Sequence, residues 1–102
     1  NLALKSPPIK EQDIVAAIRK LLDFRRAYYV RSTGAFQRAG TPDLVGWVRG
    51  IPFAWEVKRP GKDATDKQKA ELERAAKAGG SVAVIHSLEE AVEALQNMWD
   101  YR

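Results

Sequence analysis

Residues 40–58 read GTPDLVGWVRGIPFAWEVK, in which two apolar runs are separated by a turn signal around Gly50. Both runs are rich in the β-branched and aromatic residues that favour strands. Pro42 and Pro60 lie just outside the runs, where a missing backbone N–H does not interrupt a strand ladder. The stretch therefore predicts a β-hairpin, and the rest of the chain is arranged around it.

The predicted hairpin gathers three charged side chains on one surface. With residues 50–51 as the loop, Asp43 falls opposite Lys58, and Glu56 points to the same side as Lys58 because side chains alternate with period two. Two carboxylates beside a cation suit a divalent-metal site that activates water against a phosphodiester. A solvated ion pair would explain an isolated E-x-K motif equally well. Asp43, however, precedes an uncharged strand and has no local partner.

Composition and charge describe one globular domain over residues 1–102, with 45% hydrophobic and 29% charged residues. The formal charge of +4 favours a polyanionic partner. The absence of cysteine excludes disulfides and thiolate metal sites and is compatible with a reducing cytosol. The apolar runs are far shorter than the ~20 residues of a membrane-spanning helix, and the N-terminus lacks a signal-peptide core. We expect a soluble, cytoplasmic protein that does not bind membranes.

The N-terminal quarter should form an extended arm over residues 1–8 and a helix over residues 9–24. The helix is indicated by an apolar stripe of Ile14, Ile18, Leu21 and Leu22. Glu11 lies on or beside this stripe, where a carboxylate needs a partner. Acidic residues are also favoured in the first turn of a helix, so its position has a purely structural explanation as well.

Residues 27–31 are expected to form the first strand, and the following loop leads to Asp43. Basic and aromatic residues in this region and after Lys58 are candidates for following a phosphate backbone. Each is explained as well by a packed tyrosine or phenylalanine or by a solvated cation. The candidates are Tyr28, Arg31, Phe36, Arg38, Arg59 and Lys62.

A second helix is expected over residues 65–79, with Gly79-Gly80 as its C-terminal stop. Its inward residues should be Leu72, Ala75 and Ala76. Thr65-x-x-Gln68 has the pattern of a capping box, in which the amide of Gln68 satisfies a backbone donor. Gln68 also lies on the inward face of the helix, four residues before Leu72.

The C-terminal part should form a short strand over residues 81–86 and a last helix. The apolar run Val82-Ala83-Val84-Ile85 is typical of an interior strand covered on both faces. A second capping box, Ser87-x-x-Glu90, opens the helix. Its inward residues should be Leu88, Ala91, Val92, Leu95 and Met98, and His86 receives no functional role. Trp99 and Tyr101 are expected to pack on the core or on a second subunit.

Three of these motifs together resemble a known family. Gly40-Thr41-Pro42-Asp43, Glu56-Val57-Lys58 and Gln68 are similar, in order and spacing, to the virus-type replication-repair nuclease (VRR-NUC) domain, a branch of the PD-(D/E)xK nucleases. The resemblance covers most of the chain. It implies a restriction-endonuclease-like α/β core, a mixed β-sheet flanked by helices in the order α-β-β-β-α-β-α, which agrees with the elements predicted above.

The resemblance also implies an activity and roles for residues. Members carry a metal-site Glu on the first helix, which here corresponds to Glu11, the only Glu before position 56. Glu11, Asp43, Glu56 and the Val57 carbonyl would bind Mg²⁺ or Mn²⁺, Lys58 would position water, and Gln68 would lie beside the catalytic patch. The implied function is a metal-dependent, structure-specific DNA endonuclease, a homodimer that resolves four-way Holliday junctions. Alternatives are a flap or branched-end nuclease working with a helicase, and a basic module that binds DNA without cutting it.

Overall fold

The computed structural model describes residues 9–32 and 38–100. The elements follow in the predicted order: α1 (Glu11–Phe24), β1 (Tyr28–Arg31), β2 (Leu44–Val48), β3 (Ile51–Val57), α2 (Asp66–Lys77), β4 (Ser81–Ile85) and α3 (Leu88–Asp100). The helix α1 begins two residues later than expected, and the predicted arm over residues 1–8 lies outside the described residues. Within the described ranges, no helix is long and apolar enough to cross a membrane.

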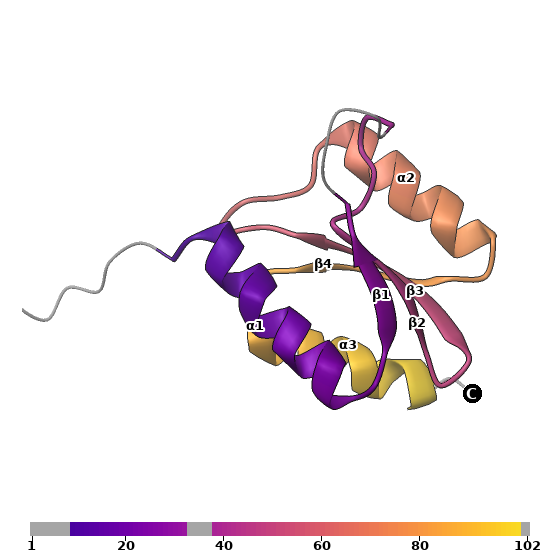
Figure 1. The fold of residues 1–102 in the computed structure, drawn as a ribbon. Helices are drawn as coiled ribbons and strands as arrows, with labels where there is room; N and C mark the ends of the chain where they lie inside the picture. Colours follow the sequence, from indigo (N-terminus) through magenta and orange to yellow (C-terminus); the bar gives the residue numbers. More distant parts are fainter. Residues whose placement is uncertain (1–8, 33–37, 101–102) are drawn as a thin grey trace, which may run out of the picture.

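The four strands form one mixed sheet in the order β1-β2-β3-β4. The pairs β1/β2 and β2/β3 are antiparallel, whereas β4 lies parallel to β3 and is reached through α2. Figure 1 shows α1 and α3 together on one side of the sheet and α2 on the other. This is the α/β architecture expected from the sequence, because a parallel neighbour needs a crossover and a helix supplies it.

The hairpin turn differs from the predicted one. Val48 pairs with Ile51, so the two loop residues are Arg49 and Gly50 rather than residues 50 and 51. Arg49 has φ 51° and Gly50 φ 82°, the left-handed conformations that a tight two-residue hairpin turn requires. Pro52 thus lies inside β3, where β4 has not yet begun alongside it, and its missing N–H leaves no ladder bond unmade.

The corrected turn shifts the hairpin register by two residues. Leu44 pairs with Trp55, and extending the ladder by one position puts Asp43 opposite Glu56 instead of Lys58. Because the side-chain period is two, a shift of two keeps every residue on its predicted face. The expected grouping of Asp43, Glu56 and Lys58 therefore survives the error in pairing.

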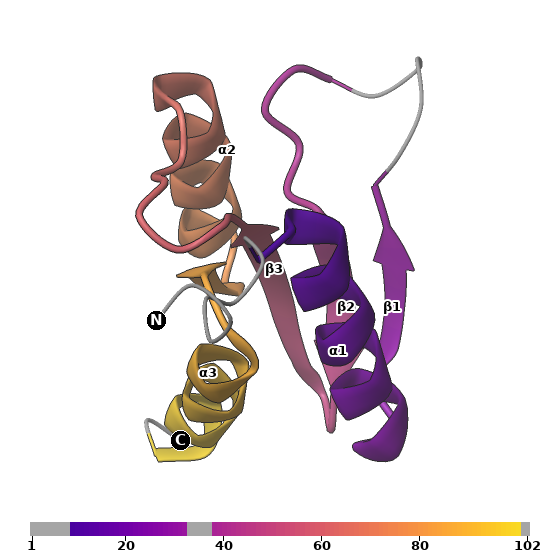
Figure 2. The same cartoon turned by 90° about the vertical axis from the view of Figure 1, so that its left-hand side faces the viewer.

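The core lies between the sheet and the pair α1 and α3. Alternate residues of β3 enter it, and the rings of Phe53 and Trp55 pack against each other at 4.9 Å between centroids. Figure 2 shows α1 and α3 approaching the sheet from this side. The buried apolar residues are Ile14, Val15, Ile18, Leu22, Leu44, Val48, Ile51, Phe53, Trp55, Val57, Ile85, Ala91, Leu95 and Met98.

Three packing predictions are wrong. Among the described strands β4 lies at the edge of the sheet and is mostly half-buried rather than interior, although α2 and α3 cover its two faces as expected, because an apolar run does not reveal whether a further strand pairs beside it. Ala76 is exposed because α2 turns only a narrow stripe with Leu72 toward the sheet. Leu88 is also exposed, as the first residue of α3.

Trp99 packs on the core, with the guanidinium groups of Arg25 and Arg49 over its ring. Tyr101 lies outside the described residues.

Candidate active site

The centre of the candidate site is formed by Asp43 and Glu56, where β2 begins and β3 ends. Asp43 Oδ2 accepts a hydrogen bond of 2.7 Å from the backbone N–H of Val57. The side-chain oxygen of Asp43 thereby takes the place that a backbone carbonyl would have if the ladder between β2 and β3 continued beyond the start of β2. This bond fixes the Asp43 carboxylate at the end of β3, directly beside Glu56.

The glycine and proline that precede Asp43 have identifiable structural roles. Gly40 adopts φ 83°, and a Cβ atom there would lie only 2.7 Å from the backbone oxygen of Lys67 in α2. Pro42 is buried. The G-x-P-D segment therefore packs closely against the first turns of α2 and delivers Asp43 to the strand in one orientation.

Among the residues that the structure describes, Glu56 is the charged one that is buried, with 3% of its surface exposed. Its Oε1 atom is buried without a hydrogen-bond partner, and its Oε2 atom lies 4.0 Å from Lys58 Nζ. Burial, and then the adjacent Asp43 carboxylate, raise the pKa of Glu56 to about 8, while the Lys58 ammonium partly opposes this shift. At neutral pH Glu56 therefore holds a proton unless a further cation comes close.

Glu11 lies at the edge of this group. It is the first residue of α1 and half-buried, and its negative charge contributes to the raised pKa of Glu56. Over residues 9–32 and 38–100, however, no three His, Asp or Glu side chains lie close enough together to hold a metal ion as they stand. Ionised carboxylates repel one another, so a compact three-acid arrangement is not expected without a cation.

The chemistry of these groups fits a hard divalent cation. Glu56 Oε1 is a buried oxygen without a partner, and burial beside the Asp43 carboxylate raises the pKa of Glu56 even with the Lys58 ammonium nearby. Carboxylate and carbonyl oxygens are the donors that Mg²⁺ and Mn²⁺ prefer. Asp43 and Glu56 could act as the two main ligands, with Glu11 and the Val57 carbonyl as further donors.

Gln68 serves as a helix cap in the structure. Its Oε1 accepts a 2.8 Å hydrogen bond from the Thr65 N–H, and Thr65 Oγ1 accepts one of 3.2 Å from the Gln68 N–H. The predicted capping box is thus confirmed. A role of Gln68 beside the carboxylates stays a prediction, supported by the contact of Gly40 with the same turn of α2.

The predicted DNA contacts that lie among the described residues are exposed. Arg38 Nη2 donates to both carboxylate oxygens of Glu71, at 2.9 and 3.1 Å, and Arg74 Nη1 donates to Glu71 Oε2 at 2.8 Å. Arg59 and Lys62 line a cleft of about 350 Å³ next to the start of α1. Arg31 is exposed at the end of β1. The predicted contact Phe36 lies outside the described residues.

The sequence prediction missed Trp47 and the cluster around Glu71. Tyr28 and Trp47 are 58% and 54% exposed, and their rings stack at 4.7 Å between centroids. A signal for Trp47 was available, because the segment 44–48 is apolar at every position and so predicts apolar groups on both faces of the sheet. No local pattern pairs Glu71 with Arg38, since the two are distant in sequence.

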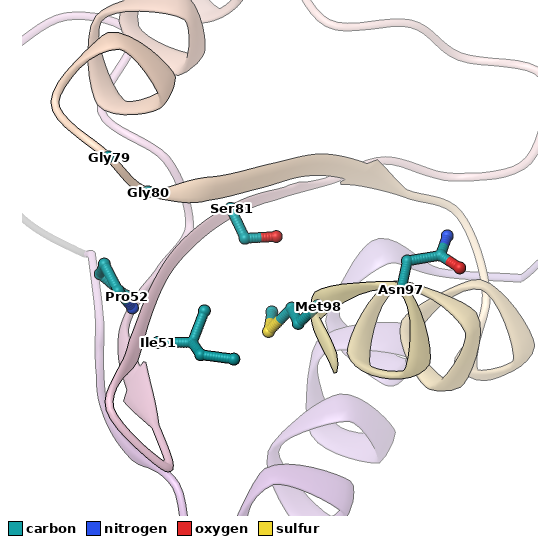
Figure 3. A pocket seen from close by; sticks show the side chains of 7 residues that line it. All are labelled: Ile51, Pro52, Gly79, Gly80, Ser81, Asn97 and Met98. Atoms are coloured by element: carbon teal, nitrogen blue, oxygen red, sulfur yellow. The ribbon is translucent and has the colours of Figure 1, made fainter. Parts of the chain in front are cut away.

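A further pocket lies at the opposite end of β3 from Glu56. It has a volume of about 320 Å³, and Figure 3 shows Ile51, Ser81 and Met98 bordering it. The described residues that line it, Ile51, Pro52, Gly79, Gly80, Ser81, Asn97 and Met98, include no ionisable side chain. The pocket therefore offers no acid, base or charged metal ligand.

Comparison with known proteins agrees with this arrangement. Residues 9–89 match the family model of the VRR-NUC domain. A solved structure described as a VRR-NUC domain has 24% sequence identity and a TM-score of 0.72, covering 84% of this chain and 94% of that one. A second, described as a VRR-NUC domain protein, has 22% identity and a TM-score of 0.71, covering 88% of both chains. The search of curated proteins found no match.

Proposed function

Because the chain belongs to the VRR-NUC family of nuclease domains, we propose that it is a metal-dependent endonuclease that hydrolyses phosphodiester bonds in DNA. The observation that carries this proposal is the buried Glu56 carboxyl beside Asp43, with one oxygen atom lacking a partner and a pKa raised to about 8. A buried acid in this state destabilises the fold when ionised, and a bound cation would relieve that cost.

The proposed ligands are the carboxylates of Glu11, Asp43 and Glu56 with the Val57 carbonyl. Bound there, Mg²⁺ or Mn²⁺ would supply Lewis-acid polarisation of the phosphate and an activated water. The hydrogen bond from the Val57 N–H orients Asp43 before any cation arrives. Such preorganisation is what makes charge stabilisation effective in a catalytic site.

Lys58 is proposed to orient the attacking water and to stabilise charge that develops on the phosphate. Its backbone N–H donates a 2.9 Å hydrogen bond to the Ile85 carbonyl, which fixes the strand end. Its ammonium lies 4.0 Å from Glu56 Oε2, too far for a strong charge-assisted hydrogen bond. The ammonium therefore keeps donors for a substrate, and Gln68 on α2 is proposed to complete the patch.

The preferred substrate is proposed to be branched DNA, in particular a four-way junction cut by a homodimer. Two identical sites related by a two-fold axis can cleave two strands symmetrically. This assignment rests on the family resemblance, whereas the carboxylate geometry supports only phosphodiester cleavage. The alternatives are a flap or branched-end nuclease that works with a helicase, and a DNA-binding module without activity.

The decisive experiment is a cleavage assay on plasmid, flap and four-way junction substrates. We expect cleavage with Mg²⁺ or Mn²⁺, none with EDTA, and binding with little turnover in Ca²⁺. Glu56→Gln should lower turnover by about 10³-fold. Glu73→Gln is the matched control, because Glu73 lies on α2 and forms an exposed ion pair with Lys77.

The outcomes separate the three classes of function. Undiminished cleavage in excess chelator would refute the metal mechanism. Tight binding without cleavage in any cation would support the non-catalytic module. Paired, symmetric cuts in the junction by a dimeric protein would support the resolvase, whereas cleavage confined to flaps would support the branched-end nuclease.

A further inference from the structure

The sheet face that bears Asp43 and Glu56 is only partly covered. The helix α2 contacts β3 and β4, and Figure 2 shows β1 at the edge of the sheet away from α2. On this face Tyr28, Val30 and Trp47 are more than half exposed. Three large apolar side chains on one small surface indicate a binding site rather than scattered exposure.

These side chains border a groove between β1, β2 and α2. The groove has a volume of about 350 Å³, and we call it the aromatic groove. Residues of α2 line one side of it, and the sheet residues that line it include Tyr28, Val30, Val45, Trp47, Pro52 and Ala54. The Tyr28 and Trp47 rings stack with an angle of 28° between their planes. Because both residues are more than half exposed, the pair offers aromatic surface to a ligand.

The aromatic groove runs into a second cleft that leads toward the carboxylates. This cleft, of about 320 Å³, is lined by Arg38, Pro42, Glu71 and Arg74, and it shares Val45 and Ala54 with the aromatic groove. Pro42 directly precedes Asp43. Two adjoining clefts thus run from the stacked aromatic rings past two arginines to Pro42, the residue before Asp43.

We propose that the aromatic groove binds unpaired nucleotides of the DNA substrate, with one base stacked on the Tyr28 and Trp47 pair. Aromatic side chains combined with a positively charged channel are the usual means of binding single strands without sequence preference. The two arginines outnumber Glu71, so the cleft is suited to a phosphate backbone. This inference rests on the proposed phosphodiester cleavage and favours its flap or branched-end alternative, because a four-way junction with fully paired arms offers no unpaired stretch for the groove.

The spacing along β2 sets the length of the unpaired stretch. Trp47 and Asp43 lie four residues apart on the same face, which corresponds to about 13 Å of strand. Stacked nucleotides of one strand are about 3.4 Å apart, so this span equals about four of them. An unpaired stretch of that length could reach from the aromatic rings to the cleaved phosphate.

The test is a binding measurement by fluorescence anisotropy in Ca²⁺, with a labelled single strand of about 12 nucleotides and the matching blunt duplex. Trp47→Ala should weaken single-strand binding by about 5- to 150-fold and change duplex binding less than about twofold. Trp47→Phe should restore most of the affinity. Phe24→Ala is the control, because Phe24 is an exposed aromatic residue on α1 and should change neither.

Two outcomes would overturn the inference. In the first, Trp47→Ala binds both DNAs as the wild type does; in the second, it loses affinity for both equally and changes from dimer to monomer in sedimentation. The second result would identify the face as a subunit interface. Failure of the proposed function gives a different result. In that case the wild type does not cleave DNA in Mg²⁺, whatever the binding measured in Ca²⁺.

A second measurement uses flaps of increasing length in Mg²⁺. Wild-type cleavage should rise until the flap reaches about four nucleotides and then level off. In Trp47→Ala this dependence on length should disappear, whereas Phe24→Ala should retain it. The same length dependence in wild type and Trp47→Ala would contradict the proposed contact.

Discussion

On β3, neighbouring residues alternate between two very different faces of the sheet. Trp55 points to the closed face, beneath α1 and α3, where the main hydrophobic core cluster lies. Glu56 points to the open face, which α2 covers only in part and which carries the carboxylates, Lys58 and the exposed Trp47. Residues that stabilise the fold therefore alternate along one strand with residues proposed to act in catalysis. Substitutions one residue apart should then differ in whether they lower stability or activity.

The largest expected loss of stability comes from the closed face. Trp55→Ala removes a fully buried ring and should lower the free energy of unfolding by ~3–5 kcal/mol, a large share of a small domain's stability. Trp47→Ala, on the open face, should cost no more than ~1.5 kcal/mol through the lost stacking with Tyr28. Urea unfolding followed by circular dichroism measures both. Equal losses would remove the distinction between the faces.

Lys58→Ala should act on turnover and hardly on binding or stability. We expect single-turnover cleavage to fall by about 10²- to 10³-fold, because the ammonium stabilises charge that develops only in the transition state. Affinity for DNA in Ca²⁺ should stay within a few fold. Lys77→Ala, on the exposed side of α2, is the control for loss of one positive charge. A Lys58→Ala variant that cleaves at the wild-type rate would refute its assignment.

Glu56→Gln should stabilise the metal-free protein at high pH. The folded-state pKa of Glu56 is raised from 4.5 to about 8, so the wild type loses stability as pH rises from about 5 to 8. The variant has no such group, so the two should melt alike near pH 4.5 and the variant should melt higher at pH 8. Thermal unfolding in EDTA across this range measures the difference. Adding Mg²⁺ should reverse the order, because a metal that binds only the folded wild type raises its midpoint.

The smallest expected effect concerns His86, at the end of β4. Its Nδ1 lies 3.0 Å from Glu90 Oε1 and its Nε2 lies 2.8 Å from the Lys62 carbonyl, so both nitrogens face acceptors. These bonds, that to Glu90 first, raise the pKa of His86. The stability that they provide should be complete below pH 6.5 and disappear as pH rises through the raised value.

The substitution that tests this effect is His86→Gln in the Glu56→Gln background, where Glu56 no longer titrates in the same range. The exposed contacts should be worth ~0.2–1 kcal/mol more at pH 5.5 than at pH 9, where the neutral imidazole keeps only one N–H donor. Thermal unfolding at the two pH values gives the difference. A penalty that does not depend on pH would show that the imidazole acts through packing alone.

The fold and the carboxylate grouping were predictable because they depend on periodicity. The loop was misplaced since Arg49-Gly50 lacks the usual Asn-Gly or Asp-Gly signal, yet a shift of two residues left Asp43 and Glu56 on one face. The position of β4 could not be predicted, because pairing at a sheet edge is a property of the whole fold. The ion pair of Arg38 with Glu71 also depends on tertiary approach and has no local signal.

The Arg49-Gly50 turn also has a consequence for the order of folding. β2 and β3 are joined by two residues, whereas β3 and β4 are separated by the whole of α2. Short loops close in microseconds or less and long-range parallel pairing is slow, so we expect the hairpin to form first. Asp43 and Glu56 should then meet while still hydrated and ionised, and Glu56 should take up its proton only when β4 pairs beside β3 and α2 packs over this face of the sheet. Without metal, refolding near neutral pH should therefore include a late step that consumes a proton.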